Sequence, residues 1–218
     1  MVRALGWIGV AGAVGSIAAV LALDGTLGGQ QVRGRELRRA TISEYVYTSG
    51  SWAFVVAVLT LAATSAALLM GLIRAGRVRW RSAGSVLMTL WVVGLLAVVA
   101  FPKHDWVAGP STSGTVHRVA TLVAFVALPV AVLLIARGHS GAARAARWLA
   151  VIGMGWLAVL FGAIAVGMLT DQSWWRLIPL GLVERGIAGF EVAALIALGL
   201  WLTRGSSAAV STVASRAS

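Results

Sequence analysis

Residues 52–73 read WAFVVAVLTLAATSAALLMGLI, and none of them is charged. A helix rises 1.5 Å per residue, so about 20 apolar residues cross the roughly 30 Å hydrocarbon core of a bilayer. This stretch is therefore long enough to span a membrane. Five further runs have the same character, at residues 5–23, 84–101, 116–136, 148–169 and 182–203. The pattern predicts an all-α, polytopic integral membrane protein with a six-transmembrane-helix bundle.

The composition agrees with this prediction. Of the 218 residues, 59% are apolar and 11% are charged, whereas a soluble domain carries about 25% charge. The net charge of +11 would suggest nucleic acid as a partner of a soluble protein, but the mean hydropathy of +0.90 makes the lipid bilayer the expected partner instead. The chain has no cysteine, which excludes disulfides, thiolate catalysis and cysteine-ligated metals.

The breaks between the spans leave no room for a separate soluble domain. We expect one transmembrane domain over residues 1–218, with an extracytoplasmic loop at residues 24–51 and a disordered cytoplasmic tail at residues 204–218. The first span could instead be a cleaved signal peptide, because Arg3 precedes it and Val20-Leu21-Ala22 resembles a peptidase site. Its apolar run is longer than the usual 7–15 residues, which favours retention.

Arginine predicts the orientation, since Lys and Arg near span ends are retained in the cytoplasm. With both termini cytoplasmic, that side carries ten arginines and no acid: Arg3, Arg74, Arg77, Arg79, Arg81, Arg137, Arg144, Arg147, Arg204 and Arg216. Tryptophan favours the headgroup level, and eight of the ten lie near predicted span ends. Trp91 and Trp156 lie mid-span, where we expect them to pack between helices. The chain is predicted to cross a plasma membrane several times.

Small residues spaced four apart let membrane helices approach closely. A homodimer is therefore a possible partner, and examples of such pairs are Gly12 with Ser16, Ala158 with Gly162, and Ala163 with Gly167.

Glu191 is the polar residue that most needs an explanation. It lies near the bilayer centre, where a charge costs about 2.5–3.5 kcal/mol, and Glu184 precedes it by two turns on the same stripe. A protonated carboxyl bonded to a hydroxyl is one arrangement, with Ser16, Thr60, Thr64 or Thr121 as the partner. An ion pair with Arg118 or Arg185 is the other. Glu191 is then either a structural interhelical contact or a ligand or proton site.

The predicted outer side holds the remaining polar residues. Thr41-Ile42-Ser43-Glu44 has capping-box spacing, which predicts a helical turn before the second span. His117 opens the fourth span, and Pro129 inside that span predicts a kink, as a packing feature or a hinge. We expect no metal and no cofactor, because metal-ligand spacings, paired haem histidines and nucleotide loops are all missing from the sequence.

Several short blocks together resemble one family. They are Ile42-Ser43-Glu44-Tyr45, Phe101-Pro102, His117, and Gly181-Leu182-Val183-Glu184-Arg185. In order and placement the chain is similar to the bacterial membrane family called domain of unknown function 998, from about Leu5 to Leu202. The resemblance implies a six-helix bundle and no assigned activity.

These blocks all fall on the predicted outer side, which suggests an outward-facing polar pocket. We expect six residues to line it, with Glu191 at its floor: Glu44, Tyr45, His117, Arg118, Glu184 and Arg185. The wider set of ligand-binding candidates adds His104, Asp105 and Asp171. For an enzyme, the catalytic candidates are Glu191, Glu184 and His117.

Three functions remain open. The first is a non-enzymatic protein that binds or moves a small or lipophilic solute through this pocket. The second is an intramembrane enzyme, a lyase, isomerase or cyclase, that acts on an isoprenoid or lipid; there Glu191 would protonate the substrate and Trp91 or Trp156 would stabilise a carbocation, as in terpene cyclases. The third is a structural or accessory subunit.

Overall fold

The computed structural model describes residues 1–32, 35–104 and 109–214, with side chains for all of these except residues 32, 35 and 205–214. Its elements, in chain order, are α1 (Val2–Thr26), β1 (Gln31–Val32), β2 (Arg35–Glu36), the 3-10 helix η1 (Ile42–Tyr47), α2 (Ser51–Arg74), α3 (Ala83–Ala100), α4 (Thr112–Ile135), α5 (Ala142–Thr170), the 3-10 helix η2 (Trp174–Arg176) and α6 (Leu180–Ala214).

The predicted six-helix, all-α architecture is confirmed. Within the described residues, six helices are long and apolar enough to cross a membrane, the last of them over Leu180–Arg204. The strands β1 and β2 form an antiparallel pair of two residues each, which the sequence did not predict. α6 continues to Ala214; disorder over residues 204–218 stays a prediction.

Helix ends differ from the predicted spans where polar residues stabilise them. α4 begins at Thr112, four residues before its predicted start, because the Ser111 side chain accepts a hydrogen bond from the Gly114 N–H and caps the helix. α1 runs to Thr26 and so includes Asp24 in its last turn. The predicted span ends at Leu23, because the sequence alone does not show that Asp24 is paired with a cation from another part of the chain.

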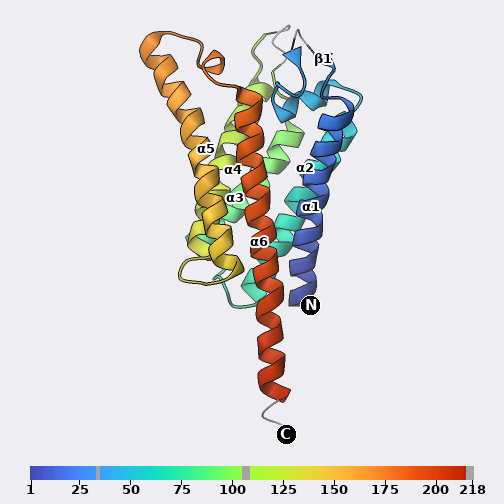
Figure 1. The fold of residues 1–218 in the computed structure, drawn as a ribbon, viewed down its shortest axis with the longest axis vertical. Coiled ribbons are helices and arrows are strands. Elements are labelled where there is room, and N and C mark those ends of the chain that lie inside the picture. Colours follow the sequence, from blue (N-terminus) through green and yellow to red (C-terminus); the bar gives the residue numbers. More distant parts are fainter. Residues whose placement is uncertain (33–34, 105–108, 215–218) are drawn as a thin grey trace.

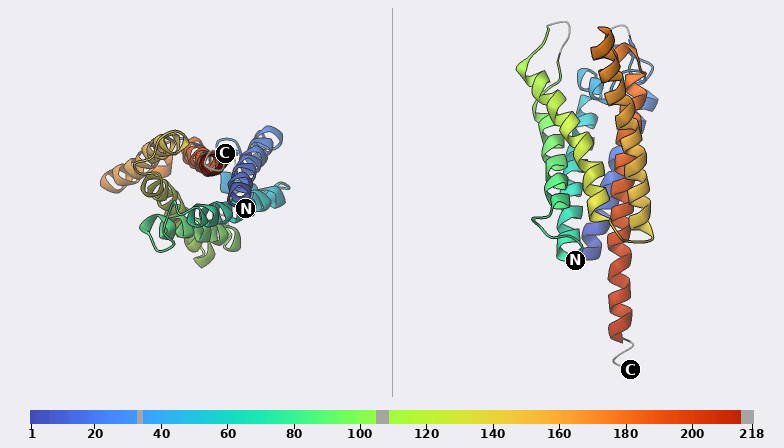
Figure 2. Two further views of the ribbon diagram at one scale, coloured as in Figure 1. Left: turned by 90° about the horizontal axis from the view of Figure 1, so that it is seen from below. Right: turned by 90° about the vertical axis from the view of Figure 1, so that its left-hand side faces the viewer.

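The six helices form a ring (Figures 1 and 2). Each helix packs against its neighbours in sequence, and α6 closes the ring by packing against both α5 and α1. α6 also contacts α2 and α4, and its span is the most buried of the six. Residues of α6 are therefore well placed to meet groups from most of the bundle.

Glycines set the distance of α1 from its neighbours. A Cβ at Gly12 would lie 2.1 Å from Thr64 Cγ2 on α2, and one at Gly6 would lie 2.8 Å from Thr203 Cγ2 on α6. The Ser16 hydroxyl donates to Ala57 O at 2.9 Å and so joins α1 to α2. The Gly12 and Ser16 pair thus serves packing inside the bundle, and a homodimer stays a prediction.

The two mid-span tryptophans contact other helices. Trp91, 2% exposed, donates from Nε1 to Ser65 Oγ at 3.1 Å. Trp156 covers Gly186, where a Cβ would approach its ring to 2.5 Å. Both positions agree with the packing role expected for them.

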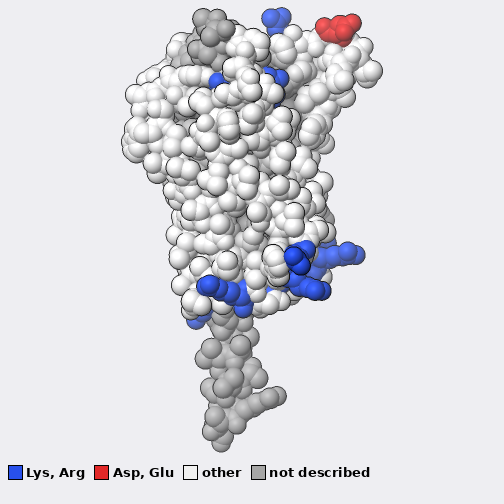
Figure 3. Space-filling model, turned by 180° about the vertical axis from the view of Figure 1, so that it is seen from behind, with Lys and Arg blue, Asp and Glu red and all other residues white. Residues whose placement is uncertain are grey.

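The two ends of the bundle differ in charge. We call the end with the α1–α2 and α5–α6 connections the cap end, and the end with Met1 and the α2–α3 and α4–α5 loops the basic end. At the basic end Arg77 lies over the Trp201 ring at 4.1 Å, and His139 packs on the same ring. Figure 3 shows Lys and Arg gathered around this end, whereas the visible acidic side chains lie at the opposite one.

Candidate functional site

Arg185 and Asp24 form the central contact of the cap end. A guanidinium has five N–H donors. Arg185 Nε and Nη2 donate to the two Asp24 carboxylate oxygens at 2.9 and 2.7 Å. Nη1 donates to Ala40 O at 2.7 Å and Gly181 O at 3.0 Å, and Nη2 also donates to Leu37 O at 3.3 Å. All five donors are engaged, so this Arg185–Asp24 clamp ties α6 to the end of α1 and to the connection that follows it.

Tyr45 completes the clamp from η1. Its side chain is fully buried, and its hydroxyl donates to Asp24 Oδ1. Burial, followed by this hydrogen bond to a carboxylate, raises the pKa of Tyr45 to about 12. Tyr45 therefore holds the Asp24 carboxylate in place through this hydrogen bond, and it does not line the cavity described below.

Lys103 links the end of α3 to η1. Its Nζ lies 2.7 Å from Glu44 Oε1 and donates to Thr41 Oγ1 at 2.9 Å, while Tyr47 donates to its carbonyl at 2.8 Å. The predicted helical turn is present, but the capping box is wrong: Thr41 makes no side-chain cap. Its hydroxyl instead contacts the Lys103 ammonium and Ser43, and these contacts replace the local bond.

Two buried histidines bind backbone groups near the cap end. His117 Nδ1 lies 2.9 Å from Phe101 O and 3.1 Å from Val98 O, which are carbonyls at the end of α3. Because both partners are acceptors, we assign the proton to Nδ1, which leaves Nε2 as an acceptor in the neutral ring. His104 Nδ1 accepts the Ser111 N–H at 2.8 Å. Both rings are buried and hold backbone groups.

Beneath the cap lies a central cavity of about 220 Å³. Its walls are mostly apolar side chains of α1, α2, α3, α4 and α6, with Leu61, Trp91 and Phe125 among them. The polar residues lie mostly toward the cap end, where η1 and the start of α6 close the cavity: Ser16, Asp24, Ser43, His117, Thr121, Glu184 and Arg185. We call the cap-end part of this lining the roof.

Glu184 is the roof carboxyl outside the clamp. Its Oε2 accepts the Ile42 N–H at 2.9 Å, which joins α6 to η1. Among the described residues this is the hydrogen bond that Glu184 makes, and no salt bridge includes it. Glu184 thus combines a fixed position with an acidic group at the cavity surface.

The predicted pocket is partly brought together. His117, Glu184 and Arg185 line the cavity, whereas Glu44, Tyr45, Arg118 and Glu191 do not. Among the wider candidates, His104 is buried against Gly114, Asp171 is exposed at the end of α5, and Asp105 lies outside the described residues. Arg118 is exposed on α4.

Glu191 is 1% exposed, and neither carboxyl oxygen has a hydrogen-bond partner within the described chain. Both arrangements expected for it are therefore wrong. The hydroxyls of Ser16, Thr64 and Thr121 donate to carbonyls of their own helices, at distances of 2.7–2.8 Å, and Arg185 is held by Asp24. No hydroxyl of the described chain lies within hydrogen-bond distance of the Glu191 carboxyl group.

Sequence reasoning missed Asp24, which it treated as a loop charge. The positions of both residues relative to the membrane could have indicated the pair. Asp24 directly follows the apolar run of the first span, and Arg185 lies just inside the sixth. Opposite charges at matching depth in two spans predict a pair. What the sequence could not supply was the contact between α1 and α6.

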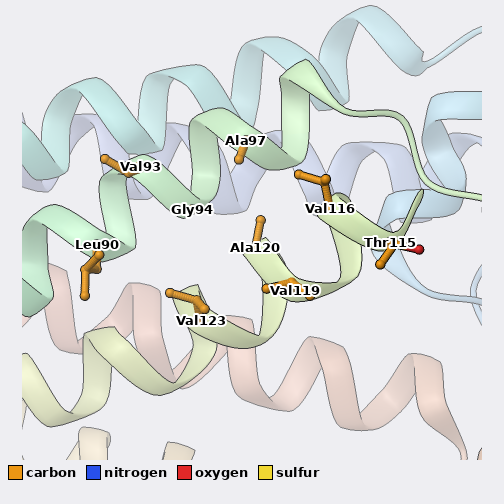
Figure 4. A pocket seen from close by; sticks show the side chains of 9 residues that line it. All are labelled: Leu90, Val93, Gly94, Ala97, Thr115, Val116, Val119, Ala120 and Val123. Atoms are coloured by element: carbon orange, nitrogen blue, oxygen red, sulfur yellow. The ribbon is translucent and has the colours of Figure 1, made fainter. Parts of the chain in front are cut away.

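A second hollow lies on the outside of the bundle, between α3 and α4 (Figure 4). It measures about 310 Å³ and is lined by apolar or small residues, with Gly94 and Ala120 at its base and Leu90, Val93 and Val123 along its sides. It carries no ionisable side chain, so we assign it to the lipid-facing surface. Within the described residues no group of three His, Asp or Glu could hold a metal ion.

Six apolar helices around a central cavity, closed by a polar cap, define an integral membrane protein. The chain belongs to the family described as "Protein of unknown function (DUF998)", whose profile matches residues 13–201. The resemblance noted in the sequence is thereby confirmed. No curated protein and no solved structure matches the chain.

Replacing Arg185 tests the clamp. The R185A variant leaves Asp24 and Tyr45 without their cation, so we expect a loss of about 3 kcal/mol of unfolding free energy. The control is R39A, because Arg39 is 82% exposed and its ion pair with Glu36 should contribute below about 0.5 kcal/mol. Unfolding in detergent measures both. Equal effects of the two variants would contradict the clamp.

The tyrosine titration tests the contact between Tyr45 and Asp24. The chain has two tyrosines, so Y47F leaves Tyr45 as the sole phenol. Its tyrosinate absorbance should titrate near pH 12, and adding D24N should lower that midpoint toward 10.0. Since the folded pKa is raised, this proton's contribution to stability is complete below pH 10 and is lost as pH rises to 12. A midpoint near 10 in the folded Y47F protein would contradict the contact.

Proposed function

We propose that this protein binds a single-chain amphiphile in the central cavity, with the hydrocarbon chain between the helices and the polar head at the roof. The observation that carries the proposal is the division of the cavity lining into apolar walls and a polar end. At about 220 Å³ the cavity is below the roughly 300–1,000 Å³ of most drug-sized sites. A slender ligand fits this volume better than a diacyl lipid.

The route into the cavity supports a ligand that comes from the membrane. Leu21 of α1 lines the cavity and is also 63% exposed, and Gly189 of α6 lines it with open space around its Cβ position. Near the basic end the two helices are close, since a Cβ at Gly199 would lie 2.6 Å from Val10 Cγ2. Toward the cap end they diverge (Figure 1). We infer a lateral opening between α1 and α6 that faces the bilayer.

We also propose that the basic end faces the cytoplasm of a bacterial plasma membrane, which places both termini inside. Nine arginines of the described chain lie at or near that end, and none of the described acids does. The cavity roof then lies in the outer half of the bilayer, and a ligand would enter from the outer leaflet.

Cysteine labelling tests this orientation, and the native chain has no cysteine to interfere. In intact cells an impermeant maleimide should label Q172C, in the α5–α6 connection, and should leave S140C, in the α4–α5 loop, unlabelled until the cells are lysed. The reverse labelling pattern would show the opposite orientation.

The other two functions have less support. In the cyclase hypothesis Glu191 acts on the substrate together with Trp91 or Trp156. Trp91 lines the cavity, but Glu191 and Trp156 do not. Glu184 and His117 do line it, and they are the residues through which catalysis stays a hypothesis. A purely structural role does not explain a cavity with a polar roof and the lateral opening inferred above.

A photoactivatable ten-carbon alcohol tests the binding proposal. In nanodiscs it should cross-link to Leu61, Trp91 and Ala124, which line the cavity and are each less than 10% exposed, so bulk lipid cannot reach them. Gly189 lines the cavity, so we expect the larger side chain of G189L to fill part of it and cross-linking at these residues to fall about tenfold.

The matched control is G162L on α5. Gly162 also has open space around its Cβ position but does not line the cavity, so its replacement should leave the cross-linking unchanged. Absence of these cross-links from the unmodified protein, or equal yields from both variants, would overturn the proposal.

A further inference from the structure

The charged residues that line the cavity do not balance one another. Three charged residues line the cavity, namely Asp24, Glu184 and Arg185. The carboxylate of Asp24 and the guanidinium of Arg185 compensate each other through two short contacts of 2.9 and 2.7 Å. The lining is therefore left with the acidic group of Glu184.

Neighbouring cations do not remove this excess. Lys103 lies near enough to act on Glu184 electrostatically, but its ammonium contacts Glu44 at 2.7 Å and Thr41 at 2.9 Å. Arg185 has no N–H left to donate, because its five donors are all engaged.

The other polar groups of the roof add acceptors. His117 donates through Nδ1 to the carbonyls at the end of α3, which leaves Nε2 as an acceptor. The Ser43 hydroxyl can accept as well as donate. An acceptor-rich roof with one excess acid suits a head that is cationic and donates hydrogen bonds, and it disfavours an anionic head.

We infer that the cavity selects a primary amine at the end of a single hydrocarbon chain, and that Glu184 is the residue that recognises its ammonium group. An ammonium offers three N–H donors, one for the free oxygen of Glu184 and two for neighbouring acceptors. This inference rests on the proposed binding of an amphiphile and adds the chemical class of its head.

Three probes with the same chain test the inference: decylamine, decanol and decanoate. Binding is measured at neutral pH in phosphatidylcholine nanodiscs, with protein-free nanodiscs as the correction for partitioning. Decylamine should bind about tenfold more tightly than decanol, and decanoate should bind most weakly. Decanoate binding as tightly as decylamine would overturn the inference.

The decisive variant is E184Q. The glutamine oxygen can still accept the Ile42 N–H, so η1 should keep its position. We expect the preference for decylamine over decanol to disappear while decanol binding changes less than about twofold. E191Q is the matched control, since Glu191 lies on the same helix stripe but does not line the cavity, and it should keep the preference. A preference that survives in E184Q, or is lost equally in E191Q, would assign the head to another group.

The probes separate the two proposals. If decanol binds and the cavity cross-links form but the three heads bind alike, the inference about the amine fails and amphiphile binding stands. If none of the three probes binds and no cross-links form in the cavity, amphiphile binding itself fails.

Discussion

Arg185 and Asp24 lie 161 positions apart in the chain, and the contact between them organises the cap end of the bundle. An arginine in a membrane span is costly unless its donors are satisfied. Here α1 supplies the carboxylate, the connection after α1 supplies two carbonyls, and α6 supplies a third. These bonds join the start of α6, the end of α1 and the connection between α1 and α2. Tyr45 and the Ile42–Glu184 bond then position η1 over the cavity.

The cavity follows from two different kinds of contact between α1 and α6. Near the basic end glycines allow close contact, at Gly6 and Gly199. At the cap end a long arginine side chain joins the helices in place of direct packing. The helices therefore diverge, and Leu21 and Gly189 border the space between them. The contact that closes the cap is thus also compatible with an opening toward lipid.

The two acids of α6 have different surroundings although they lie on one stripe. Glu184 is at the roof, with a backbone donor and nearby cations. Glu191, two turns deeper, has no partner in the described chain. An unpaired group in an apolar interior is stable as the neutral acid, because the carboxylate would have no solvation. The chemistry proposed for this protein therefore lies with Glu184.

Apolar run length, an aggregate property of each segment, was enough to predict six helices, and arginine counts separated the two ends. The sequence also selected His117, Glu184 and Arg185, because they lie in short blocks that fall together on the predicted outer side of the spans. It missed Asp24, and it assigned Glu191 to a pocket floor that Glu191 does not line, since both questions depend on which helix faces which.

Local sequence is sufficient to predict which segments lie in lipid and which in water, because transfer of a side chain into lipid depends on that side chain and its near neighbours. The partners of the polar groups and the existence of a cavity depend on the packing of the helices. Both depend on contacts between residues far apart in the chain. Glycines let two helices approach closely, whereas a long arginine side chain joins helices that lie farther apart.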